Sequence, residues 1–423
     1  MKTLYILLGA LTFPTLLHAE KYSLQQCVEK ALASNASLRN ARLEIDAAAE
    51  DKNEAFSKFF PEVSATGGAF VGAKDLMRGE MEVPMMGSMP LSMIKKGVVA
   101  NITAMQPIYA GGQVLNGNKL AALQHEVRQL QYAMTEKDVR QNVQDYYWRL
   151  VSLRGNVSTL DAVDSQLNEV HRQTTQFVEA GVINRNDLLR VEMKQQEMKS
   201  QRLTLQNGIE LVRMLLAQLC GADMQAFDIV EESILNPPAP ATYFVAASEA
   251  VANREETSLT QQSVRANSLQ IKMQRGKNLP TVAVGAAGMY YNVMEKNQGN
   301  LVGLATVSVP ISDWWSNRGT KKAKIALQQS QITQADTQEK LHIDVLNAWN
   351  NLQEAYAQIE IARSSVAQAD ENLRLSRNQY DAGTLSMTDL LDAMTLYTQS
   401  HNRLTEACAN YQGRVAEYER KTK

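Results

Sequence analysis

The sequence predicts a mainly α-helical protein that also carries the strands of a membrane β-barrel, built from one repeat that occurs twice. Three observations lead to this fold class. Sequence landmarks recur in the same order about two hundred residues apart. Two segments keep a helical pattern far beyond the usual helix length, and four short segments alternate with period two. Each repeat is expected to hold two strands and a long coiled-coil hairpin of helices.

The first nineteen residues have the features of a secretory signal peptide. Lys2 supplies the positive charge, residues 4–17 form the apolar core, and Leu-His-Ala ending at Ala19 is a suitable cleavage site. Beyond Ala19, no apolar run reaches the roughly 18 residues that a spanning helix requires. We therefore expect an exported protein whose membrane span must be built from strands.

Composition excludes several classes of function. The 43 basic and 45 acidic residues nearly cancel, without a long block of one sign, so nothing predicts a nucleic-acid partner. The three cysteines are too few for a disulfide framework, and none forms a C-x-x-C pair. The histidines lie far apart, outside any nucleophile or zinc-enzyme motif. We expect no enzymatic activity, no catalytic residue, no metal site and no cofactor.

Three landmarks define the duplication. Pro61 and Pro280 each open a stretch rich in Val, Ala and Gly, and two later Pro-Ile pairs, at 107–108 and 310–311, mark a strand passing into a helix. An Ala-Gly pair followed after five residues by Asp-Leu-Leu ends at residues 189 and 391, which predicts the same turn twice. The first repeat is assigned to residues 20–235 and the second to 243–423. A proline-rich linker, 236–242, separates them.

Residues 113–178 and 317–380 contain no proline and predict helices roughly 100 Å long. In the second, apolar residues step by four and three from Leu341 to Tyr380, as in a coiled-coil seam. The pattern resumes after each turn, so helical hairpins are expected at 113–220 and 317–421. Each returning arm is about half as long as the outgoing one. The helical segments before the strands have the length to complete the pairing.

The strand pairs are expected at 61–109 and 280–311. Their length and their alternation of small or polar with apolar residues are typical of membrane barrel strands, although four such strands in isolation would also suit a soluble sandwich. Four strands cannot close a barrel, and an open edge in lipid leaves backbone groups unsatisfied. Two chains would give a filled eight-stranded barrel, whereas three would give twelve strands around a lumen. A conduit requires the homotrimer.

Three aromatic residues stand where a strand becomes a helix. They are Tyr109 in the first repeat and Trp314 and Trp315 in the second. This position suits the aromatic belt at a membrane interface, and core packing is the alternative.

The order of elements and three local motifs identify a family. The motifs are the opening Leu24-x7-Leu32-x2-Asn35-x2-Leu38, the Pro-Ile sites, and the paired Ala-Gly-x5-Asp-Leu-Leu turns. On these features the mature chain resembles the TolC-like outer-membrane efflux proteins. The resemblance implies a trimer with a twelve-stranded barrel in the outer membrane above a twelve-helix tunnel crossing the periplasm. It also implies an exit duct of a tripartite efflux or type I secretion system, docked on a periplasmic adaptor served by an inner-membrane pump.

The resemblance assigns a periplasmic gate to the hairpin tips. Tyr380 matches the gate tyrosine, Asp389 and Asp392 match two acidic residues that ring the constriction, and Asp187 matches the partner of the tyrosine. Leu385 departs from the arginine of some members, a role that Arg185 or Arg190 could take. Helix capping is an alternative, compatible role for Asp187 and Asp389.

The tips of the two hairpins are also the expected adaptor-docking surface. The residues assigned to it are Gly181, Leu188, Leu189, Gly383, Leu390 and Leu391.

Between the first two strands, methionines recur every four residues from Met77 to Met93. Thioethers suit copper(I), but Gly and Pro predict an extracellular loop in which the methionines pack together.

Of the rival functions, a periplasmic adaptor or structural protein of the cell envelope explains only a hairpin. An export duct explains the signal peptide, the duplication, the strands and the hairpins. Ducts of this architecture serve drugs, metal ions and peptides alike, so the sequence does not identify the transported substrate.

Overall fold

The computed structural model describes residues 20–73, 77–83, 87–93, 96–230, 232–292, 297–311 and 317–423. The chain divides into two compact units. The hairpin unit holds residues up to 41, 132–254 and 339–423, and the sheet unit holds 42–131 and 255–338. Each unit draws on both repeats, so the compact units cut across the duplication. The predicted signal peptide lies outside the described residues.

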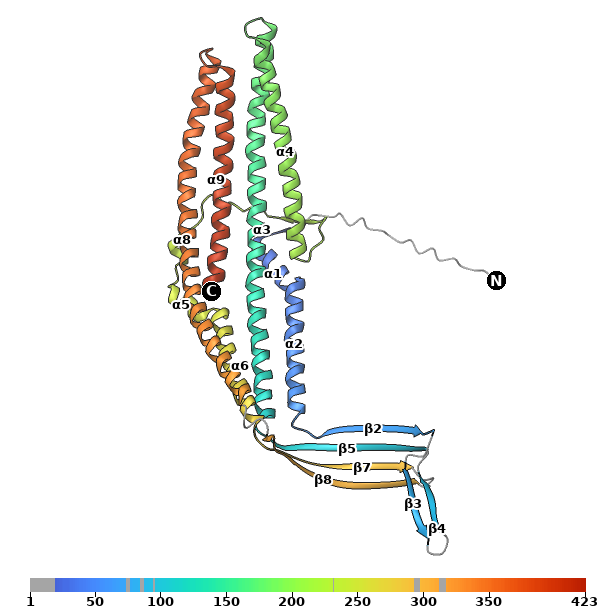
Figure 1. Cartoon of the computed structure of the whole chain (residues 1–423). Helices are drawn as coiled ribbons and strands as arrows, with labels where there is room; N and C mark the ends of the chain where they lie inside the picture. The colour runs from blue at the N-terminus through green and yellow to red at the C-terminus, as the bar shows by residue number, and fades with distance from the viewer. Residues whose placement is uncertain are drawn as a thin grey trace, which may run out of the picture. The chain divides into compact units, whose positions relative to one another are not determined.

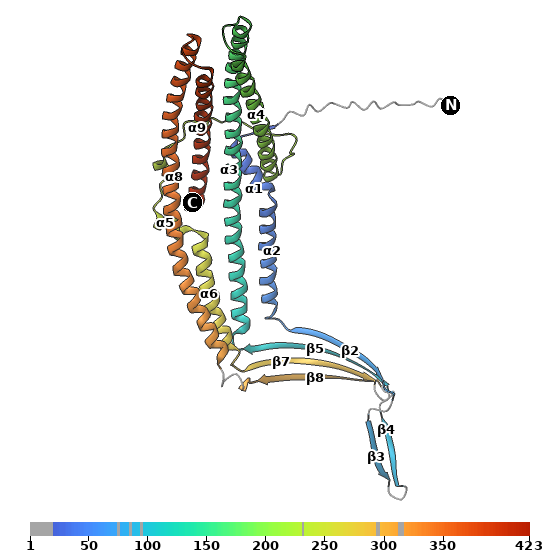
Figure 2. The ribbon, with the colours of Figure 1, turned by 45° about the horizontal axis from the view of Figure 1, so that its top comes forward.

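Two long helical hairpins dominate the hairpin unit (Figure 1). The first consists of α3 (Gln113–Glu179) and α4 (Arg185–Leu219), and the second of α8 (Arg318–Asp381) and α9 (Met387–Thr422). Neither proline nor an internal turn interrupts them, which explains their length. A turned view shows the arms of each hairpin running side by side (Figure 2). The structure therefore contains the two long helical hairpins that the sequence predicts.

Both hairpins reverse through the same helix-ending motif. Gly181 and Gly383 have φ of 71° and 73°, a left-handed conformation that glycine adopts without steric cost. The next N–H groups, of Val182 and Thr384, each donate to a carbonyl five residues back at 2.9 Å. This is the hydrogen-bond pattern of a Schellman motif. The duplicated turn predicted from the sequence is confirmed.

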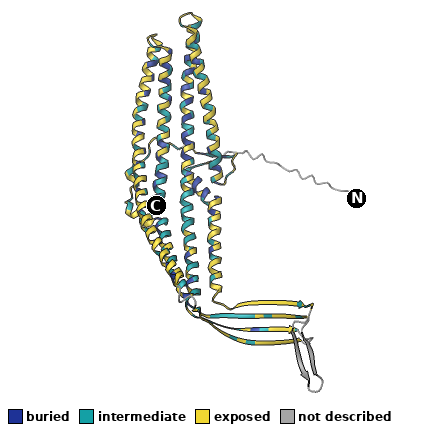
Figure 3. Cartoon of the chain, in the orientation of Figure 1, coloured by how far each residue is buried: buried dark blue, intermediate teal, exposed yellow. Residues whose placement is uncertain are grey.

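Shorter elements complete the hairpin unit. They are β1 (Glu20–Tyr22), α1 (Leu24–Ser34), β6 (Phe227–Ile229), the 3-10 turn η1 (Pro240–Tyr243) and α5 (Ala247–Asn253). β1 pairs in parallel with β6. Buried residues recur along the long helices of this unit (Figure 3). Fully buried Leu216 and Leu352 belong to one core cluster drawn from both repeats.

A four-stranded antiparallel sheet, in the order β2-β5-β7-β8, characterises the sheet unit. The strands are β2 (Glu62–Val71), β5 (Lys96–Ala110), β7 (Thr281–Asn292) and β8 (Asn297–Ser308). These are the four predicted strands, and the pairing of β5 with β7 joins the two repeats. Among the described strands, β2 and β8 each have one neighbour, so both outer edges are open.

Helices α2 (Ala36–Ser57) and α6 (Glu255–Gly276) accompany the outgoing helix in the sheet unit. The Asn118 side-chain amide of α3 donates to the Ala55 carbonyl at 2.7 Å. The Gln262 amide of α6 donates to Glu126 of α3 at 3.1 Å. α6 also runs beside α8 in both views (Figures 1 and 2), so the two segments lie alongside the long arms as predicted.

The methionine-rich segment differs from the prediction of a loop. It forms a separate antiparallel pair, β3 (Met77–Val83) with β4 (Gly87–Met93). Met77 is in register with Met93, and Met81 with Met89. The loop prediction was wrong. The Gly and Pro residues were taken to indicate irregular structure, but the methionine spacing of four is also a multiple of the strand period of two.

Across the described residues, every helix is too short or too polar to cross a membrane.

Candidate functional site

The candidate site is the tip region of the hairpin unit, where all four long helices share a core. Its buried members come from α3, α4, α8 and α9. They are Leu160, Val163, Leu167, Val170, Val191, Met198, Leu373, Met387, Leu390, Ala393 and Met394. Because one core contains side chains of both hairpins, movement of one tip relative to the other would disrupt this packing.

Tyr380 contacts the other hairpin at the edge of this core. Its hydroxyl lies 3.5 Å from the hydroxyl of Thr174, and either oxygen could be the donor. Thr174 is fully buried and also donates to the Val170 carbonyl at 2.7 Å. Burial raises the pKa of the Tyr380 hydroxyl, and the charges of Asp187 and Asp381 add to this effect. Tyr380 therefore bonds Thr174, whereas Asp187, the partner that the resemblance suggested, acts on it through its charge.

The two acidic residues of the second hairpin are exposed on α9. Asp389 stands in the first turn, where the Ser386 hydroxyl donates to its carboxylate at 2.6 Å and accepts from its N–H at 3.2 Å. Ser386 is therefore the N-cap of α9, and Asp389 is an acidic residue of its first turn. Asp392 follows almost one turn later. In the first hairpin, Asp187 is half-buried in the first turn of α4, which Asn184 caps.

Leu385 occupies the position where some relatives were expected to carry an arginine. Its side chain is partly buried and packs against the tip core. Arg185 and Arg190, the possible substitutes, are both exposed on α4. Apolar packing thus takes the place of a charged group at this position of the tip.

The residues assigned to docking differ in accessibility. Leu390 is fully buried in the tip core, so its side chain supports the surface from within rather than offering a direct contact. Leu188 and Leu391 are half-buried, and Leu189 is 45% exposed. Val182, which sequence reasoning missed, is 70% exposed directly after the turn glycine. Leu189 and Val182 are therefore two of the apolar side chains that a partner could reach on the first tip.

One histidine–carboxylate contact joins the two arms of each hairpin. His171 of α3 lies 3.7 Å from Glu192 of α4, and His401 of α9 lies 2.8 Å from Asp370 of α8. The sequence indicated only that the histidines lie outside any nucleophile or zinc-enzyme motif. No local motif announced these pairs, because their members are 21 and 31 positions apart in chains that reverse between them.

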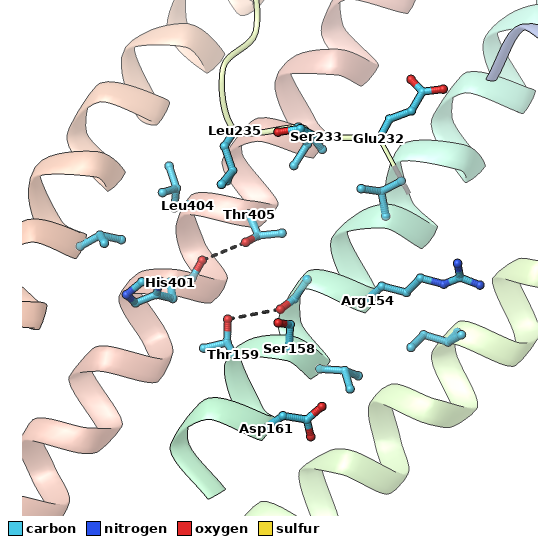
Figure 4. Close-up of a pocket in the computed structure, with 16 residues that line it drawn as sticks. Arg154, Ser158, Thr159, Asp161, Glu232, Ser233, Leu235, His401, Leu404 and Thr405 are labelled. Atoms are coloured by element: carbon cyan, nitrogen blue, oxygen red, sulfur yellow. Dashed lines mark hydrogen bonds between the residues drawn. The ribbon is translucent and has the colours of Figure 1, made fainter. Parts of the chain in front are cut away.

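The hairpin unit also contains a cavity of about 840 Å³ below the tips (Figure 4). Residues of α3 and α9 line it, and the segment 232–235 crosses its edge. Each charged lining residue has a partner: Arg154 pairs with Asp228, Asp161 with Arg202, and His401 with Asp370, while Glu232 accepts from Tyr147 at 3.0 Å. The cavity therefore offers no unpartnered charge to a ligand.

The remaining assignments concern metals and the membrane interface. Within the described part of the chain, no group of three or more His, Cys, Asp or Glu side chains could hold a metal ion. Tyr109 is 47% exposed near the end of β5, directly before α3 begins. Trp314 and Trp315 lie outside the described residues, so the aromatic belt stays a prediction.

This chain has the same fold as several solved structures of outer-membrane channels and of one membrane protein. A membrane protein from Pseudomonas aeruginosa matches with a TM-score of 0.79 at 16% identity, covering 95% of this chain and 92% of that one. The Campylobacter jejuni CmeC outer membrane channel gives 0.77 at 14%, covering 94% and 85%. The open state of the Neisseria gonorrhoeae MtrE outer membrane channel gives 0.70 at 16%, covering 97% and 93%. The fold is thus that of a TolC-like channel.

The sequence itself shows the family. The chain belongs to the outer membrane efflux protein family, whose model matches residues 27–222 and 246–417. The two matched segments coincide with the duplicated halves. The protein is therefore an outer-membrane efflux channel with a periplasmic helical extension and not an enzyme. A comparison with curated protein sequences gave no significant match.

Proposed function

We propose that three copies of this chain assemble into the exit duct of a tripartite efflux system. TolC-family channels are trimeric parts of efflux systems. The open edges of β2 and β8 support the same arrangement here, because β8 of one copy could pair with β2 of the next until the sheet closes. Three sheets of four strands give twelve strands, enough to surround a lumen.

The exposure of the sheet supports this assembly. All but one residue of β2 are exposed in the isolated chain, and exposed side chains predominate along β8. A sheet open on both faces buries too little apolar surface to be stable alone. In a trimer, lipid would cover the apolar face of the sheet, and the closed ring of strands would satisfy the backbone groups at its open edges.

The gate is assigned to the hairpin tips. The observation that carries this proposal is the contact between Tyr380 and Thr174, which joins the two hairpins within a protomer. Opening would separate the tips and break it. In a trimer, Asp389 and Asp392 would contribute six carboxylates to a narrow ring, which attracts cations. A periplasmic adaptor would dock on exposed Leu189 and Val182 and favour the separated tips.

The mass of the protein in mild detergent, together with its conductance in planar bilayers, tests this proposal. Full-length protein from outer membranes should have the mass of three copies and form low-conductance channels. A monomer that inserts into lipid and conducts would overturn the trimeric duct. A trimer with a large resting conductance would instead refute the closed gate and leave the assembly standing.

A further inference from the structure

The N-terminal helix and the end of the first hairpin approach each other closely in the hairpin unit. The Ser34 hydroxyl at the end of α1 donates to the Cys220 carbonyl at the end of α4, at 2.7 Å. Gly221 follows with φ of 61°, and a Cβ added there would lie 2.5 Å from the Ser34 hydroxyl oxygen. Only glycine permits this approach, so the main chain itself fixes the position of α1 against α4.

This approach brings two cysteines together. Cys27 shares one face of α1 with Ala31 and Ser34, at spacings of four and three. The Cys220 thiol donates to the Cys27 carbonyl at 3.4 Å, and the two thiols also interact with each other. Both side chains are fully buried, although 193 positions separate them in the chain. The third cysteine, Cys408, is buried on α9.

We propose that Cys27 and Cys220 are joined by a disulfide bond in the mature protein. A cysteine that only fills apolar space needs no second cysteine beside it, yet two of the three in this chain meet there. The hairpin unit belongs to the periplasmic extension of the family, and disulfides form and persist in the bacterial periplasm. The inference rests on this location and is independent of the gate.

The reaction is a thiol–disulfide exchange with a disulfide-bearing oxidoreductase of the envelope. The Cys220 thiolate attacks the oxidant disulfide and expels one of its sulfurs as a thiolate. Cys27 then loses its proton and attacks the Cys220 sulfur, which releases the second. Two cysteine thiols are oxidised to one disulfide, and one oxidant disulfide is reduced to two thiols.

Exchange must precede the docking of α1, because both sulfurs are inaccessible once the core has formed. The finished bond would close a loop containing most of the first repeat and hold α1 against the base of α4. Cross-links over long loops act largely by restricting the unfolded chain. The bond should therefore raise the resistance of the hairpin unit to unfolding without changing the tips.

Counting free thiols in the full-length protein tests the proposal. Protein extracted from outer membranes is denatured with an alkylating reagent present and without reductant, then digested with trypsin. Cleavage places Cys27, Cys220 and Cys408 in peptides 22–30, 214–254 and 404–414. We expect alkylation of Cys408 alone and a linked species joining 22–30 to 214–254 that reductant separates. Alkylation of all three cysteines, or a link from Cys220 to Cys408, would overturn the proposal.

Two variants sharpen the test. Cys408→Ser should keep the linked species and show no alkylated cysteine. Cys27→Ser should lose the link, expose Cys220 to the reagent, and melt at a lower temperature than the parent without reductant but at a similar temperature with it. If Cys27→Ser melts below the parent by the same amount with and without reductant, the two thiols contribute only packing and the disulfide is absent.

Discussion

The hydroxyl of Tyr380 lies 3.5 Å from the hydroxyl of Thr174, and this contact joins the two hairpins of one protomer across the edge of an otherwise apolar core. Thr174 is fully buried and also donates to the Val170 carbonyl at 2.7 Å. The contact is long for a hydrogen bond between hydroxyls, which places its strength at the low end of the usual range. Apolar packing must therefore supply most of the free energy that holds the two hairpin tips together.

Tyr380→Phe removes the hydroxyl and keeps the ring in the tip core. We expect a higher resting conductance in planar bilayers, because the closed state loses about 0.5–1.5 kcal/mol, which corresponds to roughly a two- to tenfold shift toward open channels. Thr174→Val is the matched change on the other hairpin. If the contact holds the gate, the double variant should be no more open than either single one. Additive effects would show that the two hydroxyls act separately.

The turn glycines give a second prediction. A Cβ at Gly181 or Gly383 would meet no atom within 4 Å, so alanine there tests backbone strain alone. Gly181→Ala and Gly383→Ala should each cost about 1–2 kcal/mol, lower the melting temperature and reduce efflux. Gly117→Ala is the control, since its Cβ also meets nothing but its position is helical. Equal effects of all three changes would contradict the assigned role of the turns.

The tip leucines can be separated by their burial. Leu390→Ala should destabilise the tip core by about 2–5 kcal/mol and lower the melting temperature. Leu189→Asp should leave melting unchanged and reduce efflux, because this side chain is exposed on the first tip. The control is Leu396→Asp, an exposed leucine elsewhere on α9. Full efflux by the Leu189 variant would remove the first tip from the docking surface.

The turns and the burial of Leu390 show what the sequence could and could not predict. Repetition of Ala-Gly-x5-Asp-Leu-Leu was sufficient for the turns, because a left-handed glycine is a local requirement. Long helices and paired strands likewise follow from periodicity. The coiled-coil seam that resumes after the second turn includes Leu390 and not Leu391, in agreement with the full burial of Leu390 and the partial burial of Leu391. The docking assignment nevertheless treated both leucines alike.

Side-chain partners at the site depended on tertiary placement even more. Family resemblance suggested Asp187 for Tyr380, whereas the structure places Thr174 within reach. Thr174 is a buried residue of α3 whose immediate neighbours are partly or fully exposed and carry no motif. The β3–β4 pair escaped prediction for a different reason, since Gly and Pro in the segment indicated irregular structure while the methionine spacing suited a strand equally well.

A charged cluster near the C-terminus predicts a pH dependence. Asp344 accepts from Arg254 and from Lys421, each at 2.9 Å, and both cations are buried. Burial opposes ionisation of Asp344, but these hydrogen bonds outweigh it and lower its pKa. A lowered pKa stabilises the folded state above the ordinary value near 4. That stability is lost as the pH falls through the lowered pKa.

Asp344→Asn should therefore reduce stability at pH 7 by about 1–3 kcal/mol, because two buried cations lose a charged acceptor. The deficit relative to the parent should shrink as the pH falls from 5 toward 2. Thermal unfolding of both proteins across this range provides the measurement. Glu371→Gln, which breaks an exposed ion pair with Arg374, serves as control and should leave stability nearly unchanged at every pH. A deficit independent of pH would contradict the electrostatic explanation.

Cation block of the channel tests the central claim that the duct is closed at the hairpin tips. A trivalent cation is added to the chamber that the tips face, and single-channel conductance is recorded in planar bilayers. The parent should be blocked, as should Asp381→Asn, which changes an exposed acid at the end of α8. The double variant Asp389→Asn with Asp392→Asn should conduct unhindered, since the proposed ring has lost its charge. Block of the double variant at parental concentrations would place the constriction elsewhere and contradict the assignment of the gate.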